Sequence, residues 1–298
     1  MNPAAQRTAL IVLDGWGIGA HDANDAAHVA DTPFFDSLMA TAPNATLRTD
    51  GEHVGLPAGQ MGNSEVGHMN IGAGRVVYQD LLRIDRAVAS GTLVEEPALQ
   101  EAFQVAREGG RRLHFMGLVS QGGVHSQQAH LHALCEAAAA AGISDFIVHA
   151  FTDGRDTAPR LAMNYLAELE AVLAITGGRI GSVHGRYYAM DRDQRWERVA
   201  KTYNCLVKGE GGHYATAAHG IEAHYADDIT DEFIYPFTVG EADATIKEGD
   251  VVICFNFRTD RCREITVALT QRAFPEWDLA PLPLHYVTMT NYDDTFEG

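Results

Sequence analysis

One serine in the sequence stands where local structure would make it a nucleophile. Ser64 follows a glycine-rich run of small polar residues that begins at Gly59, and this pattern predicts that a helix begins close to it. The unpaired backbone N–H groups and the positive dipole end of a helix N-terminus would favour a phosphoryl group on the serine oxygen. Ser64 is therefore a candidate nucleophile. Residues 59–80 alone leave an ordinary N-cap serine open as the alternative.

A carboxylate near the start of the chain is a candidate metal ligand. The apolar residues 8–13 predict a strand, and Asp14 follows them directly, before a Gly-Trp-Gly turn. Ligands of open α/β sheets bind at the carboxyl ends of strands, where a carboxylate suits a divalent cation. A metal held by Asp14 beside Ser64 would supply the activation that a free serine lacks. Taken alone, Asp14 fits a turn better than a metal site.

A second group of polar residues follows four predicted strands, each residue lying beyond the end of its strand. The candidates are His125, Arg155, Asp156, Arg186, Arg192, Arg258 and Arg261, and Asp153 shares a turn with two of them. Because the carboxyl ends of parallel strands share one edge of a sheet, we expect the candidates to converge on one crevice. Several arginines in one pocket would bind a small ligand that carries both phosphate and carboxylate.

Some of these candidates also have simpler explanations. His125 is compatible with a role that only stabilises a Gly-Gly turn. Arg192 and Arg195 are compatible with the solvated face of a following helix, and for Arg195 we prefer that explanation. Arg258 and Arg261 lie three apart at a predicted helix start, where the dipole disfavours cations unless they face an anion, and this favours a functional role.

The scaffold that would position these residues alternates strands with helices. Strand-like runs at residues 113–120, 145–151, 179–185, 251–257 and 282–290 alternate with helical patterns, and an earlier helix is expected to open at Asp31-Thr32-Pro33. Repeated βα units predict an α/β fold with a mostly parallel sheet covered by helices on both faces. The expected boundary lies near residues 76–79, which divides the chain into residues 1–76 and 77–298.

Composition limits the classes of partner. The 298 residues are 46% hydrophobic, and 40 acidic residues against 22 basic ones give a net charge of −18, which argues against nucleic-acid and anionic-membrane surfaces. The four cysteines lack the paired short spacings of a zinc site. With no secretory or membrane-spanning pattern, we expect a cytoplasmic protein.

Long strings across the chain resemble one enzyme family. The sequences LDGWG, GLPAGQMGNSEVGHMNIGAGRVVYQD, MGLVSQGGVHS, HAFTDGRDTAP, HGRYYAMDRDQRWERV and FNFRTDRCRE occur in the order found in cofactor-independent phosphoglycerate mutases of the alkaline-phosphatase-like superfamily. The resemblance implies that residues 1–76 are part of a metal-binding phosphatase-like domain and that residues 77–298 are an inserted substrate-binding transferase domain.

The resemblance also implies a reaction and residue roles. The family interconverts 3-phosphoglycerate and 2-phosphoglycerate through a phosphoserine, which corresponds to Ser64. Asp14 and Ser64 match ligands of two Mn²⁺ ions, and the seven crevice candidates match substrate-binding positions. Asp156 is further implied in proton transfer at the glycerate hydroxyls.

The sequence departs from the family pattern where it ends, at NYDDTFEG. The family's remaining Asp and His metal ligands and a substrate-binding lysine are absent. We therefore expect an incomplete metal site, apolar surface exposed before residue 77, and either a missing C-terminal half or a partner chain. Two alternatives stay open beside an authentic mutase: a non-catalytic phosphoglycerate-binding fragment, and a related metal-dependent phosphatase or phosphomutase with another substrate.

Overall fold

Contacts divide the computed structural model of this protein into two units, Met1–Leu82 and Arg83–Gly298. The structure describes residues 8–296. Each unit is described by itself, and the sequence-based division after residue 76 stays a prediction.

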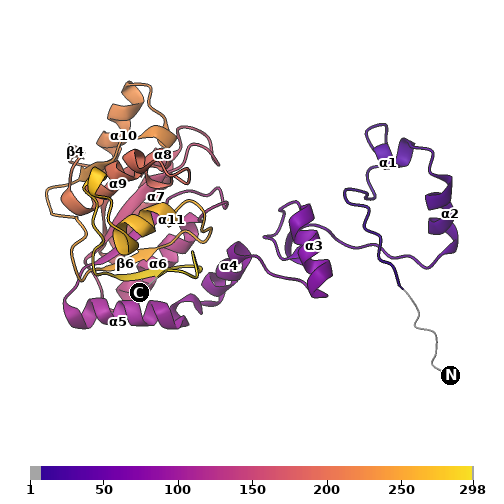
Figure 1. Cartoon of the computed structure of the whole chain (residues 1–298), viewed down its shortest axis with the longest axis horizontal. Helices are drawn as coiled ribbons and strands as arrows, with labels where there is room; N and C mark the ends of the chain where they lie inside the picture. The colour runs from indigo at the N-terminus through magenta and orange to yellow at the C-terminus, as the bar shows by residue number, and fades with distance from the viewer. Residues whose placement is uncertain (1–7, 297–298) are drawn as a thin grey trace. The chain divides into compact units, whose positions relative to one another are not determined.

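A seven-stranded sheet forms the centre of the second unit (Figure 1). Its strands are β1 (Leu113–Leu118), β2 (Phe146–Thr152), β3 (Arg179–Gly185), β4 (Gly212–Tyr214), β5 (Phe237–Val239), β6 (Val251–Cys254) and β7 (His285–Thr288). The spatial order is β4-β5-β3-β2-β1-β6-β7. Neighbouring strands are parallel except β3 and β5, which run antiparallel. The predicted α/β fold with a mostly parallel sheet is confirmed, although the short strands β4 and β5 were not predicted.

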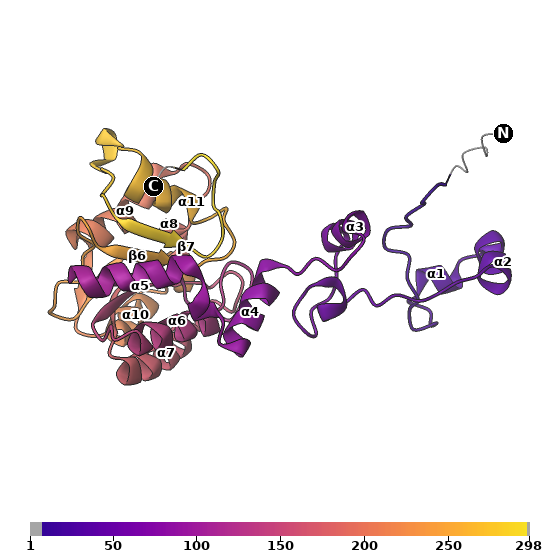
Figure 2. The same ribbon diagram turned by 90° about the horizontal axis from the view of Figure 1, so that it is seen from below.

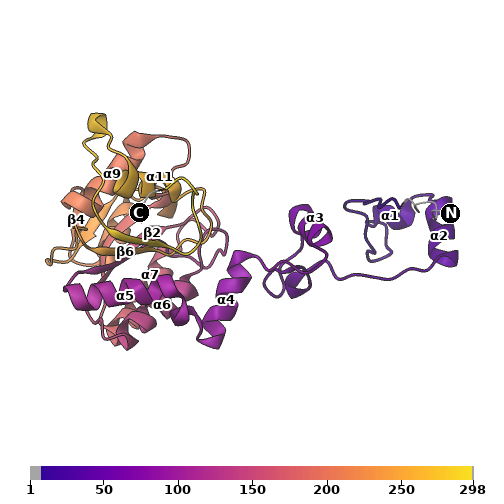
Figure 3. The same ribbon diagram turned by 60° about the horizontal axis from the view of Figure 1, so that its bottom comes forward.

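Helices cover both faces of this sheet. The α-helices from residue 80 onward are α4 (Asp80–Ser90), α5 (Pro97–Gly109), α6 (Gln128–Ala140), α7 (Ala162–Thr176), α8 (Arg186–Ala189), α9 (Trp196–Lys208), α10 (Ala217–Ala226) and α11 (Arg263–Thr266). Figures 2 and 3 show α9 and α11 on one face of the sheet, with α5, α6 and α7 on the other. Burial of both faces explains why the central strands read as continuous apolar runs.

Alternating side chains of the central strands build the core. Met116 and Leu118 of β1 belong to the same buried cluster as Val199 and Leu206 of α9. Phe115, on the opposite face of β1, packs edge to face with Phe146 of β2. Because slipping a strand by one residue would exchange these two faces, the packing fixes the register. The carboxyl ends of the strands, and the loops that follow them, are thereby held in place.

The first unit contains helices but no strand among residues 8–82. It comprises α1 (Ala26–Val29), α2 (Pro33–Thr41), a short 3₁₀ helix (Gly51–Val54) and α3 (Ser64–Ala73). The expected helix opening is confirmed, because α2 begins at Pro33 with Thr32 as its N-cap. The buried apolar cluster of the first unit is small and consists of Val54, Leu56 and Val66.

The predicted strand over residues 8–13 is wrong for this structure. These residues have no strand conformation, and the side chains of Leu10 and Ile11 are 75% and 79% exposed. An apolar run becomes a strand only when another strand pairs with its N–H and C=O groups. No described residue forms such a pairing with residues 8–13. The expected exposure of apolar surface before residue 77 is confirmed. Across residues 8–296, no helix combines the length and the apolar character that crossing a membrane demands.

Candidate functional site

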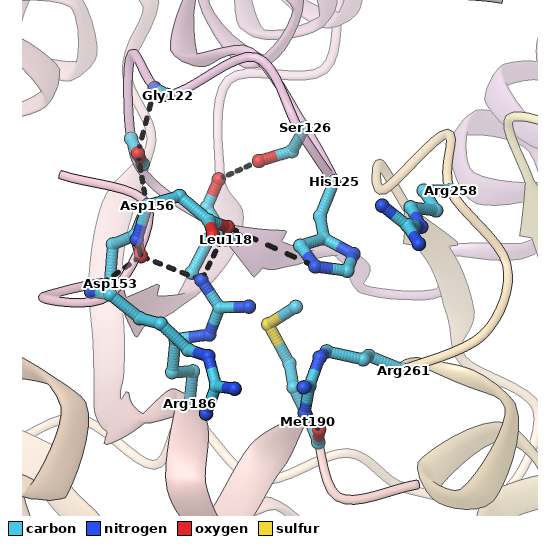
Figure 4. A network of polar contacts seen from close by, with 12 residues as sticks. Leu118, Gly122, His125, Ser126, Asp153, Asp156, Arg186, Met190, Arg258 and Arg261 are labelled. Carbon is cyan, nitrogen blue, oxygen red and sulfur yellow. Dashed lines mark hydrogen bonds and ion pairs between the residues drawn. The ribbon is translucent and has the colours of Figure 1, made fainter. Parts of the chain in front are cut away.

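The loops that follow four adjacent strands of the second unit meet at one edge of the sheet. His125 follows β1, Arg155 and Asp156 follow β2, Arg186 opens α8 directly after β3, and Arg258 follows β6. Since β3, β2, β1 and β6 are neighbouring parallel strands, their carboxyl ends lie side by side. Figure 4 shows His125, Arg186 and Arg261 grouped around one space, with Arg258 beside it. The convergence expected from the sequence is therefore present in the second unit.

A buried ion pair forms the base of the site. Arg186 Nη1 donates to Asp153 Oδ1 at 2.7 Å and to Asp156 Oδ2 at 2.6 Å (Figure 4). Burial alone would raise the pKa of Asp153, but hydrogen bonds from Ser120 and from the Asp156 N–H, together with Arg186, lower it overall. Asp153 is therefore a carboxylate that fixes the orientation of Arg186.

The turn that carries Arg155 and Asp156 depends on a glycine. Gly154 has φ +69°, and a Cβ at this position would lie 2.8 Å from the backbone nitrogen of Glu232. The Asp153 carboxylate accepts hydrogen bonds from the N–H groups of Arg155 and Asp156, at 3.1 and 2.9 Å. The close packing of this turn therefore fixes the backbone positions of Arg155 and Asp156.

His125 lies between two carboxylates. Its ring is 4% exposed, with Nε2 3.8 Å from Asp156 Oδ2 and Nδ1 3.5 Å from Asp260 Oδ1. Burial and the positive charge of Arg186 lower the pKa of His125 to about 4, so the imidazole is neutral at neutral pH. The His125 carbonyl accepts hydrogen bonds from the backbone of Phe257 and Arg258, which joins the loops after β1 and β6. His125 is thus a buried neutral group that contacts both carboxylates of the site and joins two of its loops.

A cavity of about 360 Å³ lies beside this base and is rich in arginine. Its lining residues are Arg155, Arg186, Tyr187, Met190, Asp191, Arg192, Asp193, Arg198, Glu232, Phe233 and Arg261. Burial and the nearby charges of Arg186, Arg192 and Arg155 lower the pKa of Arg261. Such crowding of cations is unfavourable in an empty pocket and favourable around an anion. The cavity therefore fits a small anionic ligand.

The three outer arginines have partners that a ligand can replace. Arg155 contacts Glu232 Oε1 at 3.3 Å, and its side chain is 54% exposed. Arg192 donates to Asp260 Oδ2 at 2.8 Å, and Arg258 Nε lies 3.3 Å from Asp260 Oδ1. The arginines of these pairs are 46–54% exposed and their acidic partners 18–29%, so solvent reaches each pair from the arginine side and an arginine can turn toward a ligand anion.

The structure also decides the alternatives for the arginines. Arg192 precedes α9, which begins at Trp196, and pairs with Asp260. Its explanation as a helix-face residue is therefore wrong. Arg195 is exposed and does not line the cavity. The expectation that Arg258 and Arg261 lie at a helix start is also wrong, because α11 begins only at Arg263.

Sequence reasoning missed several residues near the two sites, among them four charged or titratable ones. These four are His68, Arg198, Glu232 and Asp260, which contact the predicted residues or line the same cavity. Asp260 had a usable signal, since it lies between the two candidate arginines 258 and 261. His68 had one as well, because it follows Ser64 by one helical turn. Arg198 and Glu232 are distant in sequence and had none.

The first unit places Ser64 beside Asp14. Ser64 is the first residue of α3, and its Oγ donates to Asp14 Oδ2 at 2.6 Å. The N-cap is Asn63, whose side chain accepts from the Val66 N–H, so the N-cap explanation of Ser64 is wrong. His68 Nδ1 lies 3.2 Å from Ser64 Oγ. A cavity of about 420 Å³ adjoins these side chains, so the serine hydroxyl is reachable.

These residues by themselves do not fit a two-metal site. Within residues 8–296, no group of three or more His, Cys, Asp or Glu side chains is placed to hold a metal ion. Asp14 and Ser64 would give at most two protein ligands, whereas divalent ions in catalytic sites normally take three or more. The described residues contain, at most, part of a ligand set.

A family model decides the relationship of this chain to known proteins. Residues 84–294 match the model described as the N-terminus of BPG-independent PGAM. The chain belongs to the BPG-independent phosphoglycerate mutase family. The matched range covers all strands of the sheet, the helices from α5 to α11 and all seven crevice candidates.

Curated relatives of this mutase family member match almost all of the chain. The 2,3-bisphosphoglycerate-independent phosphoglycerate mutase of Bacteroides thetaiotaomicron is 48% identical over 295 residues, which cover 99% of this chain and 58% of the relative. The protein of the same name from Thermomicrobium roseum is 51% identical, with 96% of this chain and 56% of the relative covered. The chain thus spans less than two thirds of the length of these relatives.

A solved structure of a mutase shares the fold. The phosphoglycerate mutase of Leishmania mexicana, crystallised at low cobalt concentration, superimposes with a TM-score of 0.75 at 36% sequence identity. The match covers 95% of this chain and 55% of the Leishmania chain. The α/β architecture of this family member is therefore that of a known phosphoglycerate mutase.

Proposed function

We propose that this chain belongs to an enzyme that interconverts 3-phosphoglycerate and 2-phosphoglycerate through a phosphoserine at residue 64. The observation that carries the proposal is the cavity at one edge of the sheet, which five arginines line. The neutral His125 lies next to it, 3.8 Å from the Asp156 carboxylate that Arg186 binds. A phosphoglycerate carries a phosphate, a carboxylate and a hydroxyl, and this set matches arginine forks and a neutral imidazole. The names of the relatives support the same reaction.

Within the crevice, we assign substrate binding to all seven candidates. Arg186 and Arg261 lie inward and would hold one anionic group, while the more exposed Arg155, Arg192 and Arg258 would close on the other. His125 and Asp156 lie together and would contact the glycerate hydroxyl. Holding the glycerate while it reorients distinguishes a mutase from a phosphatase, because its escape would leave the phosphoserine to water.

Ser64 would accept and return the phosphoryl group. Its Oγ attacks phosphorus as the P–O bond to one glycerate oxygen breaks, and that oxygen takes up a proton to become a hydroxyl. The second glycerate hydroxyl then loses its proton and attacks the phosphoserine, and the Ser64 oxygen leaves and regains a proton. The Ser64 hydroxyl proton already points at Asp14 Oδ2, which gives it an acceptor as the oxygen attacks. The α3 N-terminus would stabilise negative charge on the bound phosphoryl group.

We propose that the complete enzyme binds manganese. Two Mn²⁺ ions would be bound in part by Asp14 and Ser64, with further ligands from the portion of the relatives that this chain does not match. We also propose a cytoplasmic setting, in keeping with a reaction on free phosphoglycerates.

A second candidate function is phosphoglycerate binding without turnover by this chain. It is favoured by one contrast: the arginine crevice is assembled within residues 83–296, whereas the described residues lack a complete metal site. The two candidates make different demands on Ser64, since only the mutase needs its hydroxyl.

An activity assay separates the two candidates. The purified chain is supplied with Mn²⁺ and 3-phosphoglycerate, 2-phosphoglycerate is followed through coupled enolase, and phosphate on Ser64 is sought by mass spectrometry. The control is Ser64→Ala, which leaves the Asn63 N-cap in place. Turnover and phosphoserine that vanish in the control support the mutase. Binding of 3-phosphoglycerate without either supports the second candidate, and absence of binding contradicts both.

A further inference from the structure

One carboxylate of the crevice contacts three candidate residues. Asp260 Oδ2 accepts from Arg192 Nη1 at 2.8 Å, whereas Asp260 Oδ1 lies 3.3 Å from Arg258 Nε and 3.5 Å from His125 Nδ1. Burial alone would raise the pKa of Asp260, but the hydrogen bond from Arg192 and the charge of Arg258 lower it overall. Asp260 is therefore an anion at neutral pH, placed where three loops meet.

His125 and Asp260 lie close together without forming a hydrogen bond. His125 Nδ1 and Asp260 Oδ1 are both buried atoms without a hydrogen-bond partner. A buried polar atom without a hydrogen bond is unfavourable, so both atoms would gain from a partner. A shift of roughly half an ångström would bring the 3.5 Å separation into hydrogen-bond range and satisfy both atoms at once.

The opposite ring nitrogen faces an oxygen that lies farther away and already accepts one hydrogen bond. His125 Nε2 lies 3.8 Å from Asp156 Oδ2, which receives the short hydrogen bond from Arg186 Nη1. Of the two carboxylate oxygens near the ring, only Asp260 Oδ1 lacks a hydrogen bond. A neutral imidazole carries one N–H, and Asp260 Oδ1 is the nearer of the two oxygens, at 3.5 Å against 3.8 Å, and makes only an ion-pair contact with Arg258. We therefore place this N–H on the Asp260 side.

We infer that Asp260 is a positioning residue of the crevice: it fixes His125 as the Nδ1–H tautomer and orients Arg192 and Arg258. The inference rests on the proposed function for the identity of the ligand. With Nδ1–H directed at Asp260, Nε2 presents a lone pair beside the Asp156 carboxylate. Two neighbouring acceptors are matched by a ligand that donates, and a glycerate hydroxyl is such a donor.

The tautomer is measurable without any ligand. Long-range ¹H–¹⁵N correlation spectra of the 298-residue chain at pH 7 distinguish the protonated ring nitrogen from the bare one. We expect His125 to be the Nδ1–H form. In Asp260→Ala the Nδ1 acceptor is gone, and we expect the proton to move to Nε2, where it can donate to Asp156.

A matched control separates this effect from general loss of a carboxylate. Asp278→Asn removes the exposed ion pair with Lys208, which lies outside the cavity, and should leave the His125 tautomer unchanged. An Nε2–H tautomer in the unmodified chain overturns the inference even if Asp260→Ala does not fold. Retention of Nδ1–H in a folded Asp260→Ala chain overturns it as well.

Calorimetry tests the effect on the arginines. Without Asp260, Arg192 and Arg258 are free to bind any phosphate, so the preference for 3-phosphoglycerate over inorganic phosphate should fall about tenfold. An unchanged preference contradicts the orientation of the arginines by Asp260. If the unmodified chain binds no phosphoglycerate, the proposed function fails, while the tautomer result still decides the role of Asp260 toward His125.

Discussion

Arg186 and Asp153 form an ion pair in which both side chains are almost completely buried, at 2% and 1% exposure. The same guanidinium nitrogen also reaches Asp156 Oδ2. A buried charge with two hydrogen-bonded partners is satisfied only while all its partners remain. The pair therefore connects the stability of the second unit to the geometry of the crevice, because Asp156 lies at the crevice itself.

Removal of Arg186 should be costly for folding and for binding. Arg186→Met leaves Asp153 and Asp156 without their cation, and we expect a loss of about 3–5 kcal/mol in the free energy of unfolding. Urea denaturation measures this change. The control Arg160→Met removes an exposed pair with Asp228 and should cost less than about 1 kcal/mol. Equal losses in the two variants would contradict the structural role of Arg186.

The glycine after Asp153 offers a test of the turn. Gly154→Ala must place a methyl group 2.8 Å from the Glu232 nitrogen at φ +69°. Gly142→Ala shares the positive φ, +83°, but has nothing within 4 Å of its Cβ position. We expect about 1–2 kcal/mol for Gly142→Ala from backbone conformation alone and a distinctly larger loss for Gly154→Ala. Thermal unfolding of both variants checks this order.

A chain of buried histidines crosses the sheet of the second unit. His114 Nε2 contacts Asp250 Oδ2 at 3.1 Å, His114 Nδ1 contacts His149 Nε2 at 3.0 Å, and the Ser182 hydroxyl joins His149 Nδ1 to His184 Nε2 at 2.7 and 2.6 Å. Burial lowers the pKa of His114, of His149 and of His184, the last to about 3. All three are neutral in the folded protein at neutral pH.

These histidines predict how stability depends on pH. The unfolded chain binds their protons near pH 6.5 whereas the folded chain does not, so their contribution is fully present above pH 6.5 and is lost as pH falls below it. His184→Gln removes one such proton. Between about pH 6 and pH 5, its unfolding free energy should fall less steeply than that of the unmodified chain, by up to about 1.4 kcal/mol per pH unit. Parallel slopes in urea titrations would show that His184 is already charged in the folded state.

Glu264 should make stability depend on pH in the opposite direction to the histidines. Its Oε1 accepts from the Gln194 N–H at 2.9 Å, and Gln194 has φ +58° in the loop that carries Arg192. Burial, followed by the nearby Asp191, raises the pKa of Glu264 to about 7. Its stabilising protonated form is complete below about pH 4.5 and is lost as pH rises through 7.

Glu264→Gln keeps the acceptor oxygen and removes the titration. We expect the difference in melting temperature, variant minus unmodified chain, to be more positive at pH 8 than at pH 5. Glu222→Gln, an exposed residue of α10, controls for loss of a surface charge. A variant that is equally shifted at both pH values would mean that Glu264 is ionised throughout.

Much of the second unit was predictable because its strands are buried on both faces. Continuous apolar runs such as residues 113–118 and 146–151 appear in the sequence as strands, and a parallel sheet then places the residues after them at one edge. This reasoning located His125, Asp156 and Arg186 at the crevice. In the first unit, the start of α2 was predicted correctly from a local signal, Pro33 after Thr32.

Other features depended on contacts that no local pattern encodes. β5 runs antiparallel to β3 as a three-residue strand, which is too short to show periodicity. The contacts of Asp260 with His125 and Arg192 arise because loops distant in sequence meet, and its position between Arg258 and Arg261 indicates only that it lies near the crevice. Residues 8–13 look like a strand by composition, yet their conformation depends on pairing, which the described residues do not supply.

Calorimetric titration of the 298-residue chain with 3-phosphoglycerate measures whether the arginine crevice binds this ligand. We predict saturable binding that weakens at least tenfold in Arg261→Met, whose side chain lines the cavity, and is unchanged in Arg195→Met, whose side chain does not. Because ion pairs supply the affinity, it should also fall as salt rises. Absence of binding, or equal binding by the two arginine variants, would contradict the account.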